Sequence, residues 1–136
     1  VSDLARPHIE TRLSDEGLVI EIFSRPGAPL FDPETDQPQA WLIELAVSMA
    51  DLFTTVSNGI AVETHISAAP LVRSGASGWD QTTERAQVIR ALLEAGGLPA
   101  QRITRVTGYS DREPVVEPLI SPRNERIELI LLRNRR

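Results

Sequence analysis

The chain has 136 residues, of which 41% are hydrophobic and 24% are charged, and its formal net charge is −5 at pH 7. These values are typical of one soluble globular domain that is long enough to bury a core, and the acidic balance argues against a nucleic-acid partner. The absence of cysteine excludes disulfides, thiolate metal sites and a cysteine nucleophile, and no apolar run reaches the about 18 residues that span a bilayer.

The first strand of the domain is predicted at residues 18–23, because Gly17 opens a β-branched run of strand length there. Residues 1–16 are predicted to form a linker or an added edge element, since their start is polar and only weakly periodic. Residues 24–38 contain four prolines and one glycine, so a loop is predicted. The domain itself is therefore placed at residues 17–136.

The first helix is predicted over residues 39–56, where apolar side chains recur at three- and four-residue spacing and form one stripe. The members of this stripe are Leu42, Leu45, Met49, Leu52, Phe53 and Val56. Asn58 and Gly59 tolerate positive φ and are predicted to end the helix.

The second helix is predicted to begin after Ser77, which can cap it, with Asp80 in the capping-box position. Gly96 and Gly97 are predicted to end this helix. Its buried stripe consists of Ala86, Ile89, Leu92 and Leu93.

Three further strands are predicted. Residues 60–67 alternate between two faces, one of which carries Glu63, His65 and Ser67. Residues 102–107 form a short strand, and the nearly continuous apolar run 127–132 suits a strand that is covered on both sides or nearly so. The predicted order is β-α-β-α-β-β, an α/β sandwich in which the helices pack on the sheet.

Three short motifs occur in order along this pattern: Thr-His-Ile-Ser at 64–67, Arg-Ala at 85–86 and Asn-Glu-Arg at 124–126. Together with Gly108 and Pro114 they resemble the motifs of the OmpA-like peptidoglycan-binding domain. The resemblance is closest to the MotB-like branch, the periplasmic domains of flagellar motor stator proteins, and it covers most of the chain. It implies a mixed sheet with the helices packed on one face.

The ligand of OmpA-like domains is the diaminopimelate residue of the peptidoglycan stem peptide. Its zwitterionic end group needs an arginine fork for the carboxylate and an acid for the ammonium. The resemblance places the fork at Arg85, and it places the acid at a position where this chain has Ser67. A neutral hydroxyl there weakens binding by on the order of 1–3 kcal/mol. His65, Asn124 and Arg126 complete the ligand-binding set that the resemblance implies.

The neighbours of these residues also depart from the family pattern. The first arginine of the family's Asn-Arg-Arg motif has become Glu125 in this chain. Asp80 or Glu84, near the start of the second helix, are candidates for replacing the acid that position 67 lacks. Trp79 is predicted to anchor the helix start by burial, and the alternative is an exposed indole that stacks on sugar.

Each predicted site residue also has a structural interpretation. Arg85 can pair with a surface carboxylate, and His65 can be a hydrogen-bonded structural residue. Asn124 and Arg126 can satisfy loop carbonyls as readily as they can contact a ligand. No metal site and no cofactor are predicted.

Catalysis is not predicted. Ser67 and His65 have the residue types of a nucleophile and its base, but residues i and i+2 on one strand face rarely place a nucleophile against its base. The sequence also has no nucleophile elbow and no phosphate-cradling glycine loop.

The resemblance therefore implies a non-catalytic domain that anchors a membrane complex, such as a flagellar stator, to peptidoglycan. It implies a periplasmic location, a homodimer, and a membrane-embedded partner and inner-membrane tether reached through an upstream segment. The alternative is a degenerate OmpA-like domain that has lost wall binding and serves as a periplasmic dimerisation or protein-docking module. The loop 24–38 with Phe31 and the turn at Tyr109 are the candidate interfaces.

Overall fold

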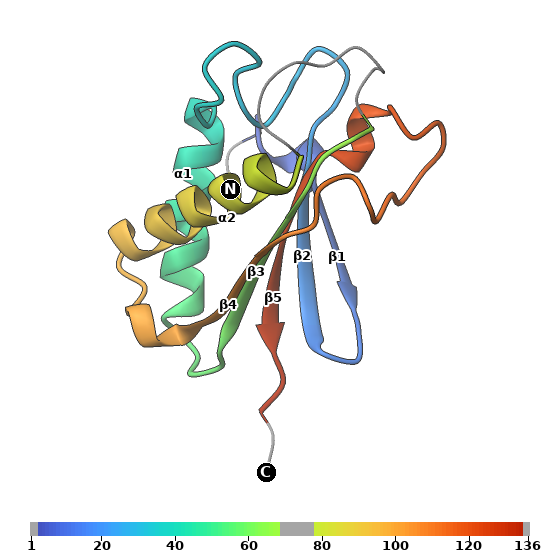
Figure 1. The fold of residues 1–136 in the computed structure, drawn as a ribbon. Coiled ribbons are helices and arrows are strands. Elements are labelled where there is room, and N and C mark those ends of the chain that lie inside the picture. Colours follow the sequence, from blue (N-terminus) through green and yellow to red (C-terminus); the bar gives the residue numbers. More distant parts are fainter. Residues whose placement is uncertain (1–2, 69–77, 135–136) are drawn as a thin grey trace.

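The computed structural model describes residues 3–68 and 78–134. These residues form a five-stranded sheet in the order β1-β2-β5-β3-β4, with two α-helices packed on one face (Figure 1). The strands are β1 (Ile9–Leu13), β2 (Gly17–Phe23), β3 (Ile60–His65), β4 (Ile103–Gly108) and β5 (Arg126–Leu132), and the helices are α1 (Ala40–Phe53) and α2 (Gly78–Ala95).

The sheet is mixed, as the sequence predicted. The pair β3–β4 is parallel and is joined through α2, whereas β1–β2, β2–β5 and β3–β5 are antiparallel. The order along the chain also agrees with the prediction from β2 onward. The strand β1 precedes the predicted elements and pairs with β2 at the edge of the sheet.

The central strand is β5, which pairs with β2 on one side and β3 on the other. Its first five residues are buried on both faces of the sheet, which explains the nearly continuous apolar run. Ile127 and Leu129 are 1% exposed and belong to the core beneath the helices. Ile130, on the opposite face, packs with Val19 and Ala61 in a smaller apolar cluster.

The core lies between the sheet and the helices. From α1 it receives Leu42, Leu45, Met49 and Phe53, and from α2 it receives Ala86, Ile89 and Leu93. The helix α2 lies very close to β4, since a Cβ on Gly108 would stand 2.3 Å from the backbone nitrogen of Thr83. Glycine is therefore required at this position by close packing.

The first helix is shorter than predicted. It ends at Phe53, which is buried, whereas two other predicted members of its stripe, Leu52 and Val56, are 54% and 41% exposed. Ser77, the predicted cap of α2, lies outside the described residues. Among the residues that are described, neither helix combines the length and the apolar character needed to cross a bilayer.

Loops gather at the upper end of the sheet in Figure 1. The described ones follow β2 and precede β5. Phe31, a predicted interface residue in the first of these loops, is only 2% exposed and belongs to the core. It is therefore not available for an interface, because the surrounding loop has folded over it.

The register of α1 can be tested with two leucines of the same helix. Leu42 is 1% exposed and Leu52 is 54% exposed. We expect Leu42→Ala to lower the free energy of unfolding by about 2–5 kcal/mol, because it leaves a cavity in the core, and Leu52→Ala to lower it by less than about 1 kcal/mol. Urea denaturation of the two variants measures the difference, and equal losses would contradict the described packing.

Candidate functional site

Arg85 of α2 lies at the loop end of the sheet, and its guanidinium is clamped between two carboxylates. Nε and Nη2 donate to Oδ1 of Asp36 at 3.0 and 2.5 Å, and Nη1 lies 3.2 Å from Oε2 of Glu125. The contact with Glu125 is an ion pair whose angles do not make an aligned hydrogen bond. The guanidinium also covers the ring of Phe31 at 4.3 Å, and the residue is only 6% exposed.

Asp36 is held in place by its own loop. Its backbone nitrogen donates to the carbonyl of Asp32, and its φ of 58° lies in the left-handed region that aspartate tolerates better than most residues. Gln81, one turn before Arg85 on α2, also donates to Oδ1 of Asp36 at 3.3 Å. The side chain of Asp36 is nevertheless 37% exposed, so one side of this carboxylate faces solvent.

An open pocket of about 360 Å³ is lined by Glu125, the second carboxylate on Arg85, and by the predicted site residue Ser67. Ser24 lines the same pocket, and its hydroxyl donates to Oε1 of Glu125 at 2.6 Å. The backbone nitrogen of Leu30 donates in turn to the Ser24 hydroxyl. Glu125 is therefore fixed between Ser24 on the pocket side and Arg85 behind it.

The pocket thus contains a carboxylate although position 67 has none. Glu125 supplies it from the position at which the OmpA-like motif has an arginine. The sequence named Asp80 or Glu84 as replacements for the missing acid, whereas the acid that lines the pocket with Ser67 is Glu125. At Arg85 one guanidinium meets the two carboxylates of Asp36 and Glu125, and Arg25 adds a second guanidinium to the pocket lining.

His65 and Arg126 lie apart from this pocket, on the sheet face that the helices leave uncovered. His65 is 3% exposed and stacks on Tyr109, with ring centroids 5.0 Å apart and planes at 7°. Arg126 donates to Glu128 at 2.9 Å and to the backbone carbonyls of Asn124 and Glu113. The structure therefore divides the predicted site into two groups.

Asn124 is 1% exposed and binds the backbone of the loop that precedes it. Its Oδ1 accepts from the nitrogens of Val115 and Val116 at 2.7 and 3.1 Å, and its Nδ2 donates to the carbonyls of Val116 and Leu119. These contacts fit the structural interpretation of the residue. Asn124 holds one wall of the loop end in shape.

Trp79, which was predicted to be buried, is 46% exposed. It lies on the first turn of α2, and the guanidinium carbon of Arg112 stands 5.9 Å from its ring. The prediction of burial was therefore wrong, although the neighbouring Gly78 packs closely against Ile66 and Ser110.

The pKa of His65 is lowered to about 3, first by burial and then by the positive charge of Arg126. Burial also raises the pKa of Glu63 on the same strand, and the Arg105 guanidinium opposes this shift. At neutral pH His65 is therefore a neutral imidazole among charged neighbours.

The residues that sequence reasoning missed are Asp36, Gln81 and Glu125. Asp36 lies 49 positions from Arg85 in a proline-rich loop, and nothing in its immediate sequence indicates a partner. A signal was available for Glu125, because an acid had replaced an arginine within a recognised motif. Such a reversal of charge predicts a new partner nearby.

No protein-family model matches the chain. In sequence it is 28% identical over 135 residues to Motility protein B of Escherichia coli K12, a match that covers 93% of this chain and 42% of that protein. The chain thus spans about two fifths of the length of this curated relative.

The fold is that of MotB periplasmic domains and other OmpA-like domains. The periplasmic domain of Helicobacter pylori MotB superposes with a TM-score of 0.80 at 17% identity, covering 98% of this chain and 86% of that one. The cell wall anchor of the T6SS from Pseudomonas aeruginosa superposes with a TM-score of 0.76 at 25% identity, covering 97% and 92%.

The lowered pKa of His65 predicts a loss of stability in acid. Between pH 6.5 and about 3 the unfolded chain binds a proton that the folded chain does not, so stability falls as the pH falls. From pH 7 to 5 we expect His65 to account for a loss of about 2 kcal/mol. The measurement is urea denaturation at both pH values in buffer with EDTA, comparing His65→Gln with His8→Gln.

The variant His65→Gln should lose this component of the pH dependence, whereas His8→Gln should keep it. The raised pKa of Glu63 acts with the opposite sign, because the folded chain then binds the proton more readily. This contribution is present in both variants and cancels in the comparison. If the free energy of unfolding depends on pH in the same way in both variants, the pKa of His65 is not lowered in the folded chain.

Proposed function

We propose that this chain is a non-catalytic peptidoglycan-binding domain that anchors a membrane complex to the cell wall. The single observation that carries the proposal is the buried guanidinium of Arg85, whose partner Glu125 lines an open pocket at the loop end of the sheet. Arginine at the motif position of OmpA-like domains, in a chain with the same fold and 28% identity to Motility protein B, supports this role. A flagellar stator is the complex that this relative suggests.

The chemistry of the pocket fits the end of a stem peptide that carries both an ammonium and a carboxylate. The carboxylate of the ligand would take the place of Asp36 on Arg85, because a planar guanidinium binds carboxylates through paired hydrogen bonds. The ammonium would bind Glu125, with the hydroxyl of Ser67 as a neutral neighbour. Asp36 is partly exposed and lies on a loop, so it can turn to solvent when it is displaced.

A specific observation favours the second candidate, a degenerate domain that has lost wall binding. Both carboxylates on Arg85 come from the chain itself, so the guanidinium is already neutralised. In that case the domain serves as a dimerisation or docking module. Exposed apolar side chains on α1, including Ile43 and Val47 one turn apart, offer a surface for a second copy.

Location and assembly follow from the same proposal. The domain would lie in the periplasm, tethered to the inner membrane through an upstream segment that meets a membrane-embedded partner. A homodimer would raise wall affinity, because two linked sites bind peptidoglycan together.

The proposal is tested first with insoluble peptidoglycan sacculi. We expect the parent to sediment with sacculi, Arg85→Ala to lose at least about ten-fold in affinity, and Arg90→Ala to bind like the parent. Arg90 is a matched control, because it lies on α2 and pairs with Glu94 away from the pocket. Circular dichroism verifies that each variant is folded, and absence of binding by the parent would favour the degenerate domain.

The role of Asp36 is tested by neutralising it. We expect Asp36→Asn to raise affinity for diaminopimelate-containing fragments several-fold, because the ligand carboxylate no longer competes with a charged side chain for Arg85. Isothermal titration calorimetry measures the change, with Glu34→Gln as the control from the same exposed loop. If Asp36→Asn binds these fragments as the parent does, or more weakly, while Glu34→Gln is unchanged, Asp36 is not displaced by the ligand.

A further inference from the structure

We propose that the uncovered face of the sheet carries a binding site for one divalent transition-metal ion, Zn²⁺ in the first place, formed by Glu63, His65 and Glu128. The site is separate from the pocket at Arg85 and does not depend on wall binding. No metal site was predicted from the sequence, because the second histidine, His8, lies far from His65 along the chain. Glu128 is 63 positions from His65 and reaches it only through strand pairing.

The strand register assembles the three ligands. Glu63 of β3 is the direct cross-strand partner of Glu128 of β5, and His65 follows two residues after Glu63 on the same face. One ligand atom of each residue lies within 4.8 Å of the other two. All three residues are buried, with exposures of 8%, 3% and 6% for Glu63, His65 and Glu128.

The imidazole of His65, unpaired among the described residues, is a second, independent indication of a metal ion at this site. Within the part of the chain that the structure describes, neither ring nitrogen has a hydrogen-bond partner, although the side chain is only 2% exposed. A buried polar group without a partner is costly. Its Nε2 lies 3.8 Å from Oε2 of Glu128, too far for a hydrogen bond. Two ligands of a tetrahedral Zn²⁺ lie about 3.3 Å apart, so a small adjustment brings both atoms onto one ion.

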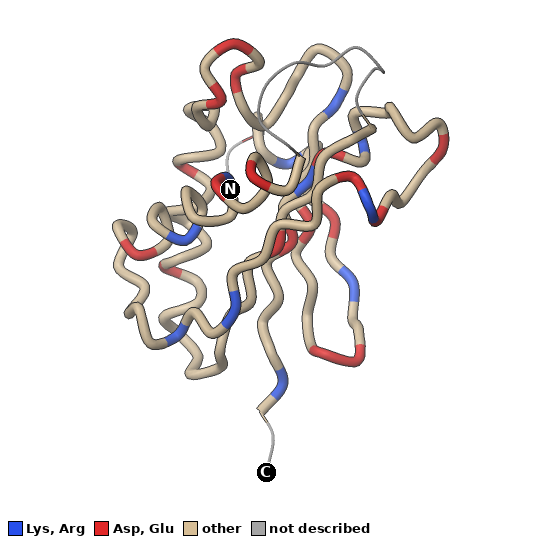
Figure 2. The backbone as a smooth tube through the Cα atoms, in the orientation of Figure 1, with Lys and Arg blue, Asp and Glu red and all other residues tan. Residues whose placement is uncertain are grey.

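Four arginines contact the glutamates around the site, namely Arg12, Arg105, Arg123 and Arg126. Glu21, Glu128 and Glu63 are neighbours on three adjacent strands, an arrangement in which like charges repel. Figure 2 shows acidic segments, in red, near the middle of the molecule. Arg126 is buried against Glu128 and also donates to two backbone carbonyls, so it keeps its place when an ion binds.

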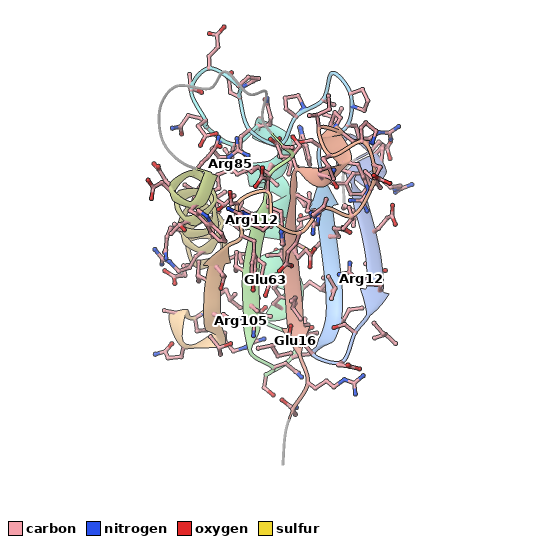
Figure 3. The ribbon with its side chains drawn as sticks, turned by 45° about the vertical axis from the view of Figure 1, so that its right-hand side comes forward. Arg12, Glu16, Glu63, Arg85, Arg105 and Arg112 are labelled. Atoms are coloured by element: carbon pink, nitrogen blue, oxygen red, sulfur yellow. The ribbon has the colours of Figure 1, made fainter. Side chains whose placement is uncertain are left out.

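Two of these arginines, Arg105 and Arg12, can move away from the glutamates when an ion binds. Arg105 binds Glu63 at 2.9 Å but also pairs with Glu16 at 2.9 Å, and its side chain is 38% exposed. Arg12 contacts Glu21 and Glu128 at 3.4 Å and is 51% exposed. Figure 3 shows Glu63 on the sheet between these two side chains, with Glu16 next to Arg105. The arginine end of each pair is partly exposed, so its guanidinium can turn to solvent when a metal ion takes its place on the carboxylate.

The donor set indicates the metal. One imidazole and two carboxylates are ligands that Zn²⁺ accepts at three protein positions, with the fourth left to solvent. Co²⁺ accepts the same set and reports its geometry through visible absorption. Mg²⁺ and Ca²⁺ prefer oxygen ligands alone and should bind weakly.

The test is a Zn²⁺ titration of the tag-free, EDTA-treated chain by calorimetry, with Co²⁺ absorption as a second readout. We expect one ion per chain with a Kd below about 10 µM, and at least ten-fold weaker binding by His65→Gln and by Glu128→Gln. The chain contains two histidines, so His8→Gln is the matched control and should bind like the parent. His8 is buried elsewhere, against Phe23 and Trp41.

A variant that improves binding keeps the test independent of folding. Arg105→Gln removes the competing cation from Glu63 and should tighten Zn²⁺ binding several-fold. The proposal is overturned if the parent shows no saturable one-to-one binding at a Zn²⁺ concentration 100-fold above that Kd. It is also overturned if folded His65→Gln or Glu128→Gln binds Zn²⁺ like the parent, or if His8→Gln loses binding. If His65→Gln does not fold, Glu128→Gln and Arg105→Gln decide the question.

Discussion

The antiparallel pairing of β5 with both β2 and β3 is the constraint on which the rest of the molecule depends. Side chains alternate along a strand, so a slip of one residue would move Ile127 and Leu129 from the core to the open face. The same slip would move Arg126 and Glu128 into the apolar layer beneath the helices. The burial of apolar side chains therefore fixes the register, and the register in turn gathers the charged residues on the other face.

That charged face differs from an ordinary solvent-exposed side of a sheet. Glu21, Glu128 and Arg126 are 3–6% exposed although no helix covers them. They are buried by one another and by longer side chains, such as Arg123, which binds Glu21 through two hydrogen bonds. A buried network of this kind is stable only while each charge has a partner. His65 also lies in this network, but its imidazole is neutral and has no hydrogen-bond partner among the described residues.

Much of the fold could be predicted because periodicity reports burial. The stripe from Leu42 to Phe53 and the apolar run at 127–132 each match an element that packs in the core. The contacts of the candidate site could not be predicted in this way. Asp36 meets Arg85 through a loop whose path depends on proline and turn geometry, and Glu63 meets Glu128 through strand register. Both pairings are long-range, and neither leaves a local signal in the sequence.

Electrostatics at the loop end determine which of the two functional hypotheses holds. Relative to the OmpA-like motif, Ser67 removes one negative charge from the pocket, and Glu125 replaces a positive charge with a negative one, a net change of one unit toward negative. The pocket therefore keeps an acceptor for an ammonium, but it attracts a carboxylate less strongly. A ligand carboxylate must also displace Asp36, which is tethered next to Arg85 and so competes at a high effective concentration. Wall binding is retained only if the contacts of both ends of the zwitterion, with Arg85 and with Glu125, together outweigh that intramolecular ion pair.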